Sequence, residues 1–485
     1  MKDQIKGLQP ERLWHYFYEL SQVPRESRHE AGAIDWAIGV AKQLNLHFKK
    51  DKVGNLCISK PATPGYENHT PVVLQGHIDM VCEKNSGTVH DFRQDPIRLV
   101  RDGEWVRAEG TTLGSDNGIG VAAALAVLED KSLAHPPLEA LFTIDEETGL
   151  TGANALEPGF IKGKILLNCD TEEDDTFFVG CAGGKNTEIL LDIDWEKAPA
   201  NLKAVSVKLS GLLGGHSGLD IDKNRANAIK QLNRILWKAA EKINFRLFHL
   251  EGGSKHNAIP RETEYRLLIG AEQLKTLRGV IAAAETMLKN EYKGIERDVR
   301  LTVSELDTYP SKVFSPEFQD RLLNFIYALP HGVKKMSQAV PGLVETSTNA
   351  AIVQTSEKQI SFLTSQRSSV ATEIIGIADK VKAIGLLAGG KVNQGTGYPA
   401  WTPNLDSAIL KQMKSIYQTL FGSEPQVKAV HAGLECGIIG EKYAGMDMIS
   451  IGPTIHGAHS PDERVHIQSV AKFWRLLTET LRQIA

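Results

Sequence analysis

The stretch LEALFTIDEETGL, residues 138–150, joins a short apolar run to three consecutive acids, Asp145, Glu146 and Glu147. The run at 138–144 is short and rich in strand-forming residues, which is typical of a strand buried on both faces of a sheet. Three carboxylates at the end of such a strand repel one another, and a bound dication removes that cost. The stretch therefore predicts a buried strand that leads into a metal site.

Similar apolar runs lie at 72–76, 164–170 and 446–452. Residues 111–130, TTLGSDNGIGVAAALAVLED, form a Gly, Ser and Asp turn that leads into an Ala-rich helical stretch. Helical spacing of apolar residues at 28–44 predicts a further amphipathic helix. The order strand, helix, strand predicts an α/β fold, with a mixed sheet flanked by helices.

The pattern changes in the middle of the chain. Residues 203–209 alternate between apolar and polar side chains, which suits a sheet with one wet face. Further helical and alternating stretches follow, and Gly, Pro and Asn cluster at 388–404. We expect one discontinuous catalytic domain, residues 1–185 and 393–485, interrupted by an inserted α+β domain, residues 186–392.

The composition of the chain limits the classes of protein to which it can belong. The chain has 485 residues, of which 42% are hydrophobic and 24% charged, and this balance is ordinary for a globular protein. A net charge of −4 offers no basic face for nucleic acid or an anionic membrane. The five cysteines form no CxxC pair, and no stretch resembles a signal peptide or a membrane span. We expect a cytoplasmic protein with reduced thiols.

Side chains that bind metals follow the buried runs. In an open α/β sheet the carboxyl ends of the strands meet at one crevice, so residues far apart in sequence can lie together there. The candidates are His77 and Asp79 in QGHIDM, Asp116 in LGSDNG, Glu146 and Glu147 in FTIDEETG, Asp170 in LNCDTE, and His456 and His459 in PTIHGAHSPDE.

Histidine nitrogens and carboxylate oxygens, without thiolate, suit zinc, manganese or cobalt, and zinc is the first choice. Any single member of the set is more often a loop cap or a surface group, but several such sites together favour a metal. Asp79, two residues after His77, is placed to accept the second ring N–H of that histidine. Its alternative interpretation is a plain turn acid.

The motifs QGHIDM, LGSDNGIG, FTIDEETG, LNCDTE and HSPDE, in this order, resemble the M20 family of di-zinc metallopeptidases. VHAGLECG and SPDERV fit a subgroup of bacterial dipeptidases within it. The resemblance covers essentially the whole chain, and it implies a two-part catalytic domain with an inserted lid and dimerisation domain.

The resemblance also implies the roles of individual residues. Asp116 bridges two zinc ions, His77 and Asp170 complete one site, and Glu147 and His459 complete the other. Glu146 is the catalytic acid and base, and the peptide bond between Asp116 and Asn117 is cis. Asp79, as the acid that orients His77, is counted with Glu146 among the catalytic residues. Because His456 lies three residues before His459, the residues alone leave open which ring reaches metal.

Three residues of the inserted domain match substrate-binding positions of the family. The match implies that His216, among glycines in SGLLGGHSGLDI, reaches across a homodimer to stabilise the oxyanion, and that Asn257 and Arg367 hold the substrate's backbone carboxylate. The alternatives are a histidine that only tolerates a tight turn and an arginine in an ordinary surface pair. Arginine suits carboxylate binding because its guanidinium is a planar fork.

The expected activity is hydrolysis of unblocked dipeptides, including Xaa-His, by a metal-dependent dipeptidase with two zinc ions per subunit, which cobalt or manganese can replace. An N-acyl-amino-acid deacylase or a carboxypeptidase of the same family would use the same metal site. A binding protein on a retired peptidase fold ranks lower, because it would normally have lost a ligand or the acid/base residue, and here each of those positions is filled.

Overall fold

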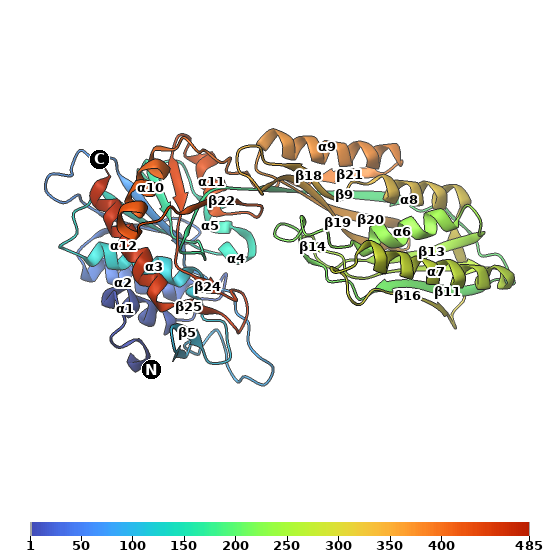
Figure 1. The fold of residues 1–485 in the computed structure, drawn as a ribbon, viewed down its shortest axis with the longest axis horizontal. Helices are drawn as coiled ribbons and strands as arrows, with labels where there is room; N and C mark the ends of the chain where they lie inside the picture. The colour runs from blue at the N-terminus through green and yellow to red at the C-terminus, as the bar shows by residue number, and fades with distance from the viewer. Residues whose placement is uncertain (1, 485) are drawn as a thin grey trace. The chain divides into compact units, whose positions relative to one another are not determined.

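The computed structural model describes residues 2–484, and the chain divides into two compact units (Figure 1). Unit 1 contains the chain up to Gly180, then Pro403–Ala429, and the chain from Leu434 onward. Unit 2 contains Cys181–Thr402 and the short segment Val430–Gly433.

Unit 1 is built on an eight-stranded mixed sheet. Its central strands β6, β3, β7 and β23 run parallel, β2 pairs antiparallel with β6, and β1 pairs antiparallel with β2. This arrangement confirms the predicted α/β fold class, with the runs at 72–76, 138–144, 164–170 and 446–452 forming the four central strands. In sheet order the strands are β1 (His47–Lys50), β2 (Leu56–Lys60), β6 (Leu138–Thr143), β3 (Val72–His77), β7 (Ile165–Asn168), β23 (Asp447–Ser450), β8 (Thr176–Cys181) and β22 (Gln426–Val430).

Helices pack on this sheet and on one another. They are α1 (Glu11–Ser21), α2 (Ala31–Gln43), α3 (Ser115–Glu129), α4 (Glu146–Gly149), α5 (Thr151–Ala155), α10 (Ala408–Phe421), α11 (Glu435–Lys442) and α12 (Ile467–Gln483). A smaller sheet contains β24 (Ile455–His456), β25 (Arg464–His466), β5 (Trp105–Ala108) and β4 (Leu99–Asp102). A 3-10 turn, η1, spans Lys2–Ile5.

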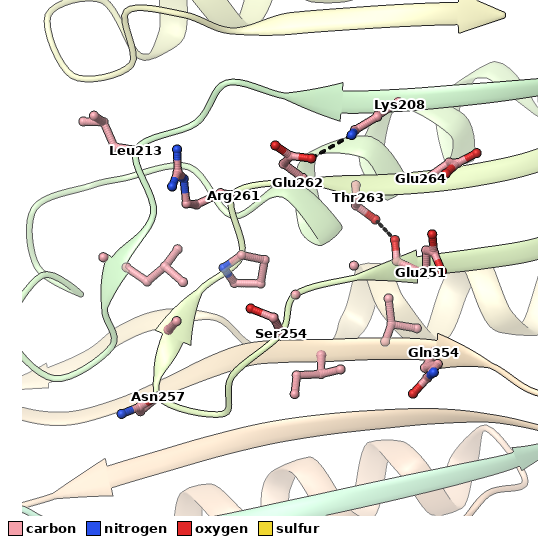
Figure 2. Close-up of a pocket in the computed structure, with 18 of the residues that line it drawn as sticks. Lys208, Leu213, Glu251, Ser254, Asn257, Arg261, Glu262, Thr263, Glu264 and Gln354 are labelled. Atoms are coloured by element: carbon pink, nitrogen blue, oxygen red, sulfur yellow. Dashed lines mark hydrogen bonds and ion pairs between the residues drawn. The ribbon is translucent and has the colours of Figure 1, made fainter. Parts of the chain in front are cut away.

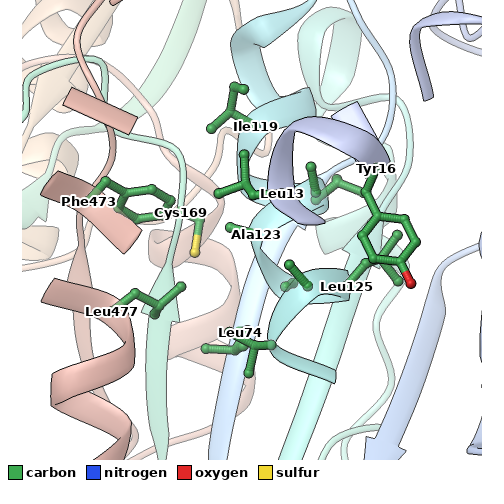
Figure 3. Packing of buried hydrophobic residues seen from close by; sticks show 14 of the residues in the cluster. Leu13, Tyr16, Leu74, Ile119, Ala123, Leu125, Cys169, Phe473 and Leu477 are labelled. Atoms are coloured by element: carbon green, nitrogen blue, oxygen red, sulfur yellow. The ribbon is translucent and has the colours of Figure 1, made fainter. Parts of the chain in front are cut away.

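Helix α3 is the centre of the unit 1 core, because side chains are buried along almost its whole length. Figure 3 shows Ile119 and Ala123 of α3 between Leu13 of α1 and Phe473 of α12. Close packing also explains a glycine within the helix: a Cβ on Gly120 would lie 2.8 Å from the carbonyl oxygen of Cys169. The Ala-rich composition lets α3 approach the sheet and so brings its N-terminus to the tips of the parallel strands.

Unit 2 is built on a nine-stranded antiparallel sheet. Its strands are β16 (Arg300–Glu305), β11 (Lys203–Ser210), β15 (Thr263–Ile269), β13 (Phe245–Gly252), β19 (Val344–Thr355), β20 (Gln359–Ser368), β9 (Gly183–Asp192) and β21 (Lys391–Gln394), with β18 (Gly332–Met336) beside β19. Its helices are α6 (Ala228–Ala239), α7 (Ala271–Glu291), α8 (Pro316–Ala328) and α9 (Ala371–Leu387).

Two short ribbons complete unit 2, β10 (Trp195–Lys197) with β17 (Lys312–Phe314), and β12 (Gly215–His216) with β14 (Ala258–Ile259). The predicted alternation at 203–209 does not appear in the burial of β11, where Ala204–Val207 are all buried, since Ala204 packs in a second small cluster with Leu268 and Val313. Among the helices of residues 2–484, none is both long and apolar enough to cross a membrane.

Candidate metal centre

The metal-binding side chains predicted from the sequence meet at the carboxyl ends of the parallel strands. His77 is the last residue of β3, Asp170 follows β7, Asp116 lies in the first turn of α3, and Glu147 lies in α4 directly after β6. His459 comes from the loop between β24 and β25. The short connections after β3, β6 and β7 explain why these residues converge.

The cluster consists of two ligand groups that share one residue. In each group the potential ligand atoms lie within 4.8 Å of one another, and the groups are His77, Asp116 and Asp170, and Asp116, Glu147 and His459. Asp116 presents a different oxygen to each side: Oδ1 is 3.1 Å from His77 Nε2, and Oδ2 is 3.2 Å from His459 Nε2. A carboxylate divided in this way is suited to bridge two cations.

The remaining contacts test whether the site fits a metal. His77 Nε2 lies 3.3 Å from Asp170 Oδ1, and His459 Nε2 lies 3.1 Å from Glu147 Oε2. Asp170 Oδ1 and Glu147 Oε1 are buried and have no hydrogen-bond partner among residues 2–484. Buried carboxylate oxygens without partners, beside imidazole nitrogens, fit a divalent cation with nitrogen and oxygen ligands.

The charges of the cluster are strongly perturbed. Burial raises the pKa of Asp170 to about 7 and raises the pKa of Glu146 well above its ordinary value. Hydrogen bonds with Asp116 and Glu147 raise the pKa of His459 to about 11. Burial opposes ionisation of Asp116 too, but the hydrogen bonds of His459 and His77 lower its pKa. The histidines thus supply too little positive charge to balance the acids of the cluster, and a bound dication would supply the rest.

Asp79 lies behind His77 and is fully buried. Its Oδ1 is 3.3 Å from His77 Nδ1, the position expected for an acid that orients the ring. The same carboxylate accepts the backbone N–H groups of Glu146 at 3.1 Å and Glu147 at 3.2 Å, and the hydroxyl of Ser27 at 2.7 Å. One side chain therefore fixes both a candidate ligand and the first turn of α4.

Asp145, the first of the three consecutive acids, has a structural role in the turn before α4. Asp145 precedes α4 in a left-handed conformation, with φ of 48°, and its carboxylate accepts hydrogen bonds from the hydroxyls of Thr148 and Thr151. Glu146 follows with its side chain in the ligand cluster, where its ligand atom lies within 4.8 Å of those of His77 and Glu147. The three consecutive acids therefore divide into a turn acid, a candidate base and a candidate ligand.

His456 does not belong to either of the two ligand groups. It is exposed in β24, and its ring lies 4.9 Å from the ring of Trp105, tilted by 35°. The hairpin of β24 and β25 holds the His456 ring beside Trp105, whereas His459 lies in the loop between the strands, with φ of 63°. The geometry thus favours His459 as the ligand.

Sequence reasoning assigned no role to Glu463, which lies four residues after His459 and is buried. Its carboxylate accepts the backbone N–H groups of Leu113, Gly114 and Ser115 at 2.7, 2.9 and 2.7 Å, and the Ser115 hydroxyl at 2.6 Å. It thereby holds the loop that carries Asp116, whose peptide bond to Asn117 is cis, as the resemblance implied. The motifs HSPDE and SPDERV both contain this residue.

Arg25 was also missed by sequence reasoning. It is buried, and its guanidinium donates to the carbonyl oxygens of Ile78 and Asp79, both at 2.9 Å, and to that of Gly114. These carbonyls belong to the loops that carry His77 and Asp116. Arg25 therefore ties the two loops together, and no local pattern around it predicts this role.

In unit 2, His216 and Asn257 line a pocket of about 960 Å³. Figure 2 shows Asn257 among the residues that line it. The Nδ1 atom of His216 accepts the backbone N–H groups of Gly218 at 3.3 Å and Leu219 at 3.2 Å. Because Nδ1 is the acceptor, the neutral ring carries its proton on Nε2. His216 is therefore set up as a hydrogen-bond donor through Nε2.

Arg367, at the end of β20, is a buried cation. Only 6% of it is exposed, and within the described chain no carboxylate lies within ion-pair distance. Its Nη1 donates to the Tyr398 hydroxyl at 2.9 Å, and its Nε has no partner among residues 2–484. The nearby His431 is also buried, and burial together with the Arg367 charge lowers the pKa of His431 to about 3. A buried guanidinium without an acid is suited to bind an anion.

Comparison with known proteins identifies the family of the chain. A family model described as Peptidase family M20/M25/M40 matches residues 73–483. The chain belongs to this family. Within it, the cytosol non-specific dipeptidase of Escherichia coli (strain K12) is 40% identical over 481 residues, which cover 99% of each chain.

Solved structures agree with this assignment to the M20 family. The aminoacylhistidine dipeptidase of Vibrio alginolyticus is 41% identical and has a TM-score of 0.90, with 100% of this chain and 99% of that chain covered. The aminopeptidase PepT of Bacillus cereus, at 16% identity and a TM-score of 0.57, with 98% of this chain and 99% of that chain covered, shares the fold alone. The family predicted from the five motifs is confirmed.

Proposed function

We propose that this chain is a metal-dependent dipeptidase that hydrolyses unblocked dipeptides, Xaa-His among them. The observation that carries the proposal is the pair of ligand groups joined by Asp116, with Glu146 beside them. The full-length similarity to an Escherichia coli relative named as a dipeptidase supports the choice of substrate. Two zinc ions are the proposed cofactors, and the cytosol, after the name of that relative, is the proposed location.

His77, Asp116 and Asp170 would hold one ion, and Asp116, Glu147 and His459 the other. When bound, two such ions polarise the scissile carbonyl and lower the pKa of the attacking water. Asp79 keeps the His77 ring oriented through its contact with Nδ1. It also keeps Glu146 in place, through the backbone N–H of that residue.

Glu146 is the proposed general base and acid. Its carboxylate takes a proton from the attacking water and passes it to the nitrogen of the leaving amine. Burial raises the pKa of Glu146, so its carboxylate binds a proton more strongly than an ordinary glutamate does.

The proposed roles in unit 2 follow from hydrogen-bonding capacity. Arg367 binds the free carboxylate of the dipeptide through the planar edge of its guanidinium, and Asn257 contributes an amide. His216 donates from Nε2 to the oxyanion, a contact worth roughly 10²–10³ in rate. Residues 186–392 serve in this proposal as the lid and dimerisation domain of a homodimer.

The central test is Glu146→Gln, which removes the base and keeps the size of the side chain. We expect turnover of Ala-His and Gly-Gly to fall roughly 10²–10⁴-fold, while bound zinc, measured by atomic emission, stays at the wild-type level. Glu441→Gln, at an exposed position of α11, is the matched control and should leave both quantities unchanged. Full activity in Glu146→Gln would remove that residue from the mechanism.

A substrate panel separates the dipeptidase from the other activities of the M20 family. We expect cleavage of free dipeptides and little cleavage of N-acetylated amino acids or longer peptides. The dimer is tested by mixing subunits that carry Glu146→Gln with subunits that carry His216→Ala. Recovery of turnover in the verified mixed dimer is expected if His216 acts across the dimer, and absence of recovery would contradict that role.

A further inference from the structure

A row of buried polar side chains crosses the central strands of unit 1. Gln75 of β3 is level with Asn168 of β7, and Asn168 is level with Ser450 of β23. All three are buried to 1% exposure or less. Polar side chains in the middle of a sheet core are costly unless each finds a partner, so the contacts of this row require an explanation.

The row is continuous. The amide of Asn168 donates from Nδ2 to Gln75 Oε1 at 2.6 Å, and the hydroxyl of Ser450 donates to Asn168 Oδ1. Beyond Ser450, the Thr171 hydroxyl lies 2.8 Å from the Ser450 hydroxyl. Because each amide uses both of its ends, the side chains fix one another's orientation.

Glu435, the first residue of α11, closes the other end of the row. Its Oε2 accepts Gln75 Nε2 at 2.6 Å and the Thr143 hydroxyl at 2.7 Å. Glu435 is 1% exposed, no lysine, arginine or histidine of residues 2–484 forms an ion pair with it, and its Oε1 has no hydrogen-bond partner there. A glutamine or methionine would fill this space without burying a charge, so the position invites a functional explanation.

The row lies one step below the candidate ligands. Along a strand, residues two apart point to the same face, so Gln75 lies beneath His77 in β3. Asn168 is the last residue of β7, two residues before Asp170. Thr143, which also donates to Glu435, is level with His77 in the pairing of β6 with β3. His77 Nε2 and Asp170 Oδ1 are 3.3 Å apart, and a slip of either strand tip would change this spacing directly.

We propose that Glu435 is a positioning residue for the metal centre: through its hydrogen bonds to Gln75 and Thr143 it sets the spacing of His77 and Asp170. The inference rests on the proposed function, since it assumes that these two residues bind metal. The Glu435 carboxylate anchors one end of the row. Through the hydrogen bonds of the row, it fixes the position of two neighbouring strands. Ligand-orienting partners of this kind change metal affinity by roughly 10–100-fold when removed.

The test measures metal binding without substrate. Wild-type protein, Glu435→Ala and Glu435→Gln are loaded with cobalt, and the visible absorption of the bound ion and the affinity in competition with a chelator are recorded. We expect Glu435→Ala to lose roughly 10–100-fold in affinity for one of the two ions and to change the cobalt spectrum. Glu435→Gln keeps an oxygen acceptor for both hydrogen bonds, so it should stay within about threefold of wild type.

Two outcomes would overturn the proposal. Unchanged affinity and spectrum in Glu435→Ala would leave only a structural role, and equal losses in the alanine and glutamine variants would point to charge instead of hydrogen bonding. If Glu435→Ala does not fold, Gln75→Met breaks the same row at its second member and should show the same loss.

Glu139→Ala is the control, because Glu139 is buried on β6 and accepts backbone N–H groups of Lys162 and Gly163, outside the row. It should lower stability without changing metal affinity. A protein that binds two ions as expected and cleaves no dipeptide would refute the proposed function and leave the role of Glu435 standing.

Discussion

Replacing Arg367 by methionine removes a buried positive charge and keeps most of the side-chain volume. In the structure this guanidinium has one hydrogen bond to a side chain, that of Tyr398, and no acid of the described residues pairs with it. If the missing partner is the carboxylate of a dipeptide, the substitution should affect only substrates that have this carboxylate. The prediction is therefore a change in selectivity, in addition to a loss of rate.

The magnitude follows from burial. Truncating one member of a buried, hydrogen-bonded charge pair costs about 2–5 kcal/mol, which corresponds to a loss of roughly 30-fold to a few thousand-fold in kcat/KM. Arg367 is 6% exposed, so solvent screens the interaction little and the upper part of this range applies. A dipeptide amide lacks the negative charge and should lose less than about threefold.

The assay compares kcat/KM for a dipeptide and for its C-terminal amide in wild-type protein and in Arg367→Met. The matched control is Arg266→Met on β15, where the arginine is partly exposed and already paired with Glu264 at 2.8 Å. The control should change neither substrate by more than about twofold, as expected for an exposed ion pair. Equal losses for the dipeptide and its amide in Arg367→Met would refute carboxylate binding.

Three further outcomes are expected. Glu463→Ala leaves three backbone N–H groups of residues 113–115 without their acceptor, at a cost of about 1–3 kcal/mol each. The thermal unfolding midpoint should therefore fall, and an unchanged midpoint would contradict the role of Glu463. Asp79→Asn should weaken zinc binding roughly 10–100-fold in chelator competition, and wild-type affinity would argue for a plain turn acid. Because the pKa of His431 is lowered to about 3, the unfolded chain binds more protons at this residue than the folded chain does between that value and about 6.5. The stability that His431 contributes should therefore be lost as the pH is lowered through this window, by up to about 1.4 kcal/mol per pH unit, and His431→Gln, measured by urea unfolding with a chelator present, should remove that part of the slope.

The sequence predicted the centre of unit 1 because the relevant information is local there. His77, Asp170 and Glu147 each follow closely after a buried apolar run, and parallel strands place such positions at one edge. The buried helix α3 could likewise be predicted from its alanines and from the turn before it. Hydrophobic period and turn chemistry were sufficient for these elements.

The supporting residues could not be predicted in this way. Glu463 acts on backbone N–H groups 348 to 350 residues away, and Glu435 acts on Gln75 across 360 residues. Such contacts depend on tertiary packing and leave no periodic trace in the chain. The choice between His456 and His459 also required the β24 and β25 hairpin, which directs one ring onto Trp105 and leaves the other in the loop.

The contacts of Asp116 have a consequence for biosynthesis. Its two imidazole neighbours come from opposite parts of the chain, His77 at a separation of 39 residues and His459 at 343. A ribosome that has translated the first group has also translated Glu147, but His459 is still missing, and closing so long a segment costs entropy before any contact is gained. The nascent polypeptide can therefore complete only the first of the two candidate ligand groups until translation is nearly over, and the second forms only when His459 has been added.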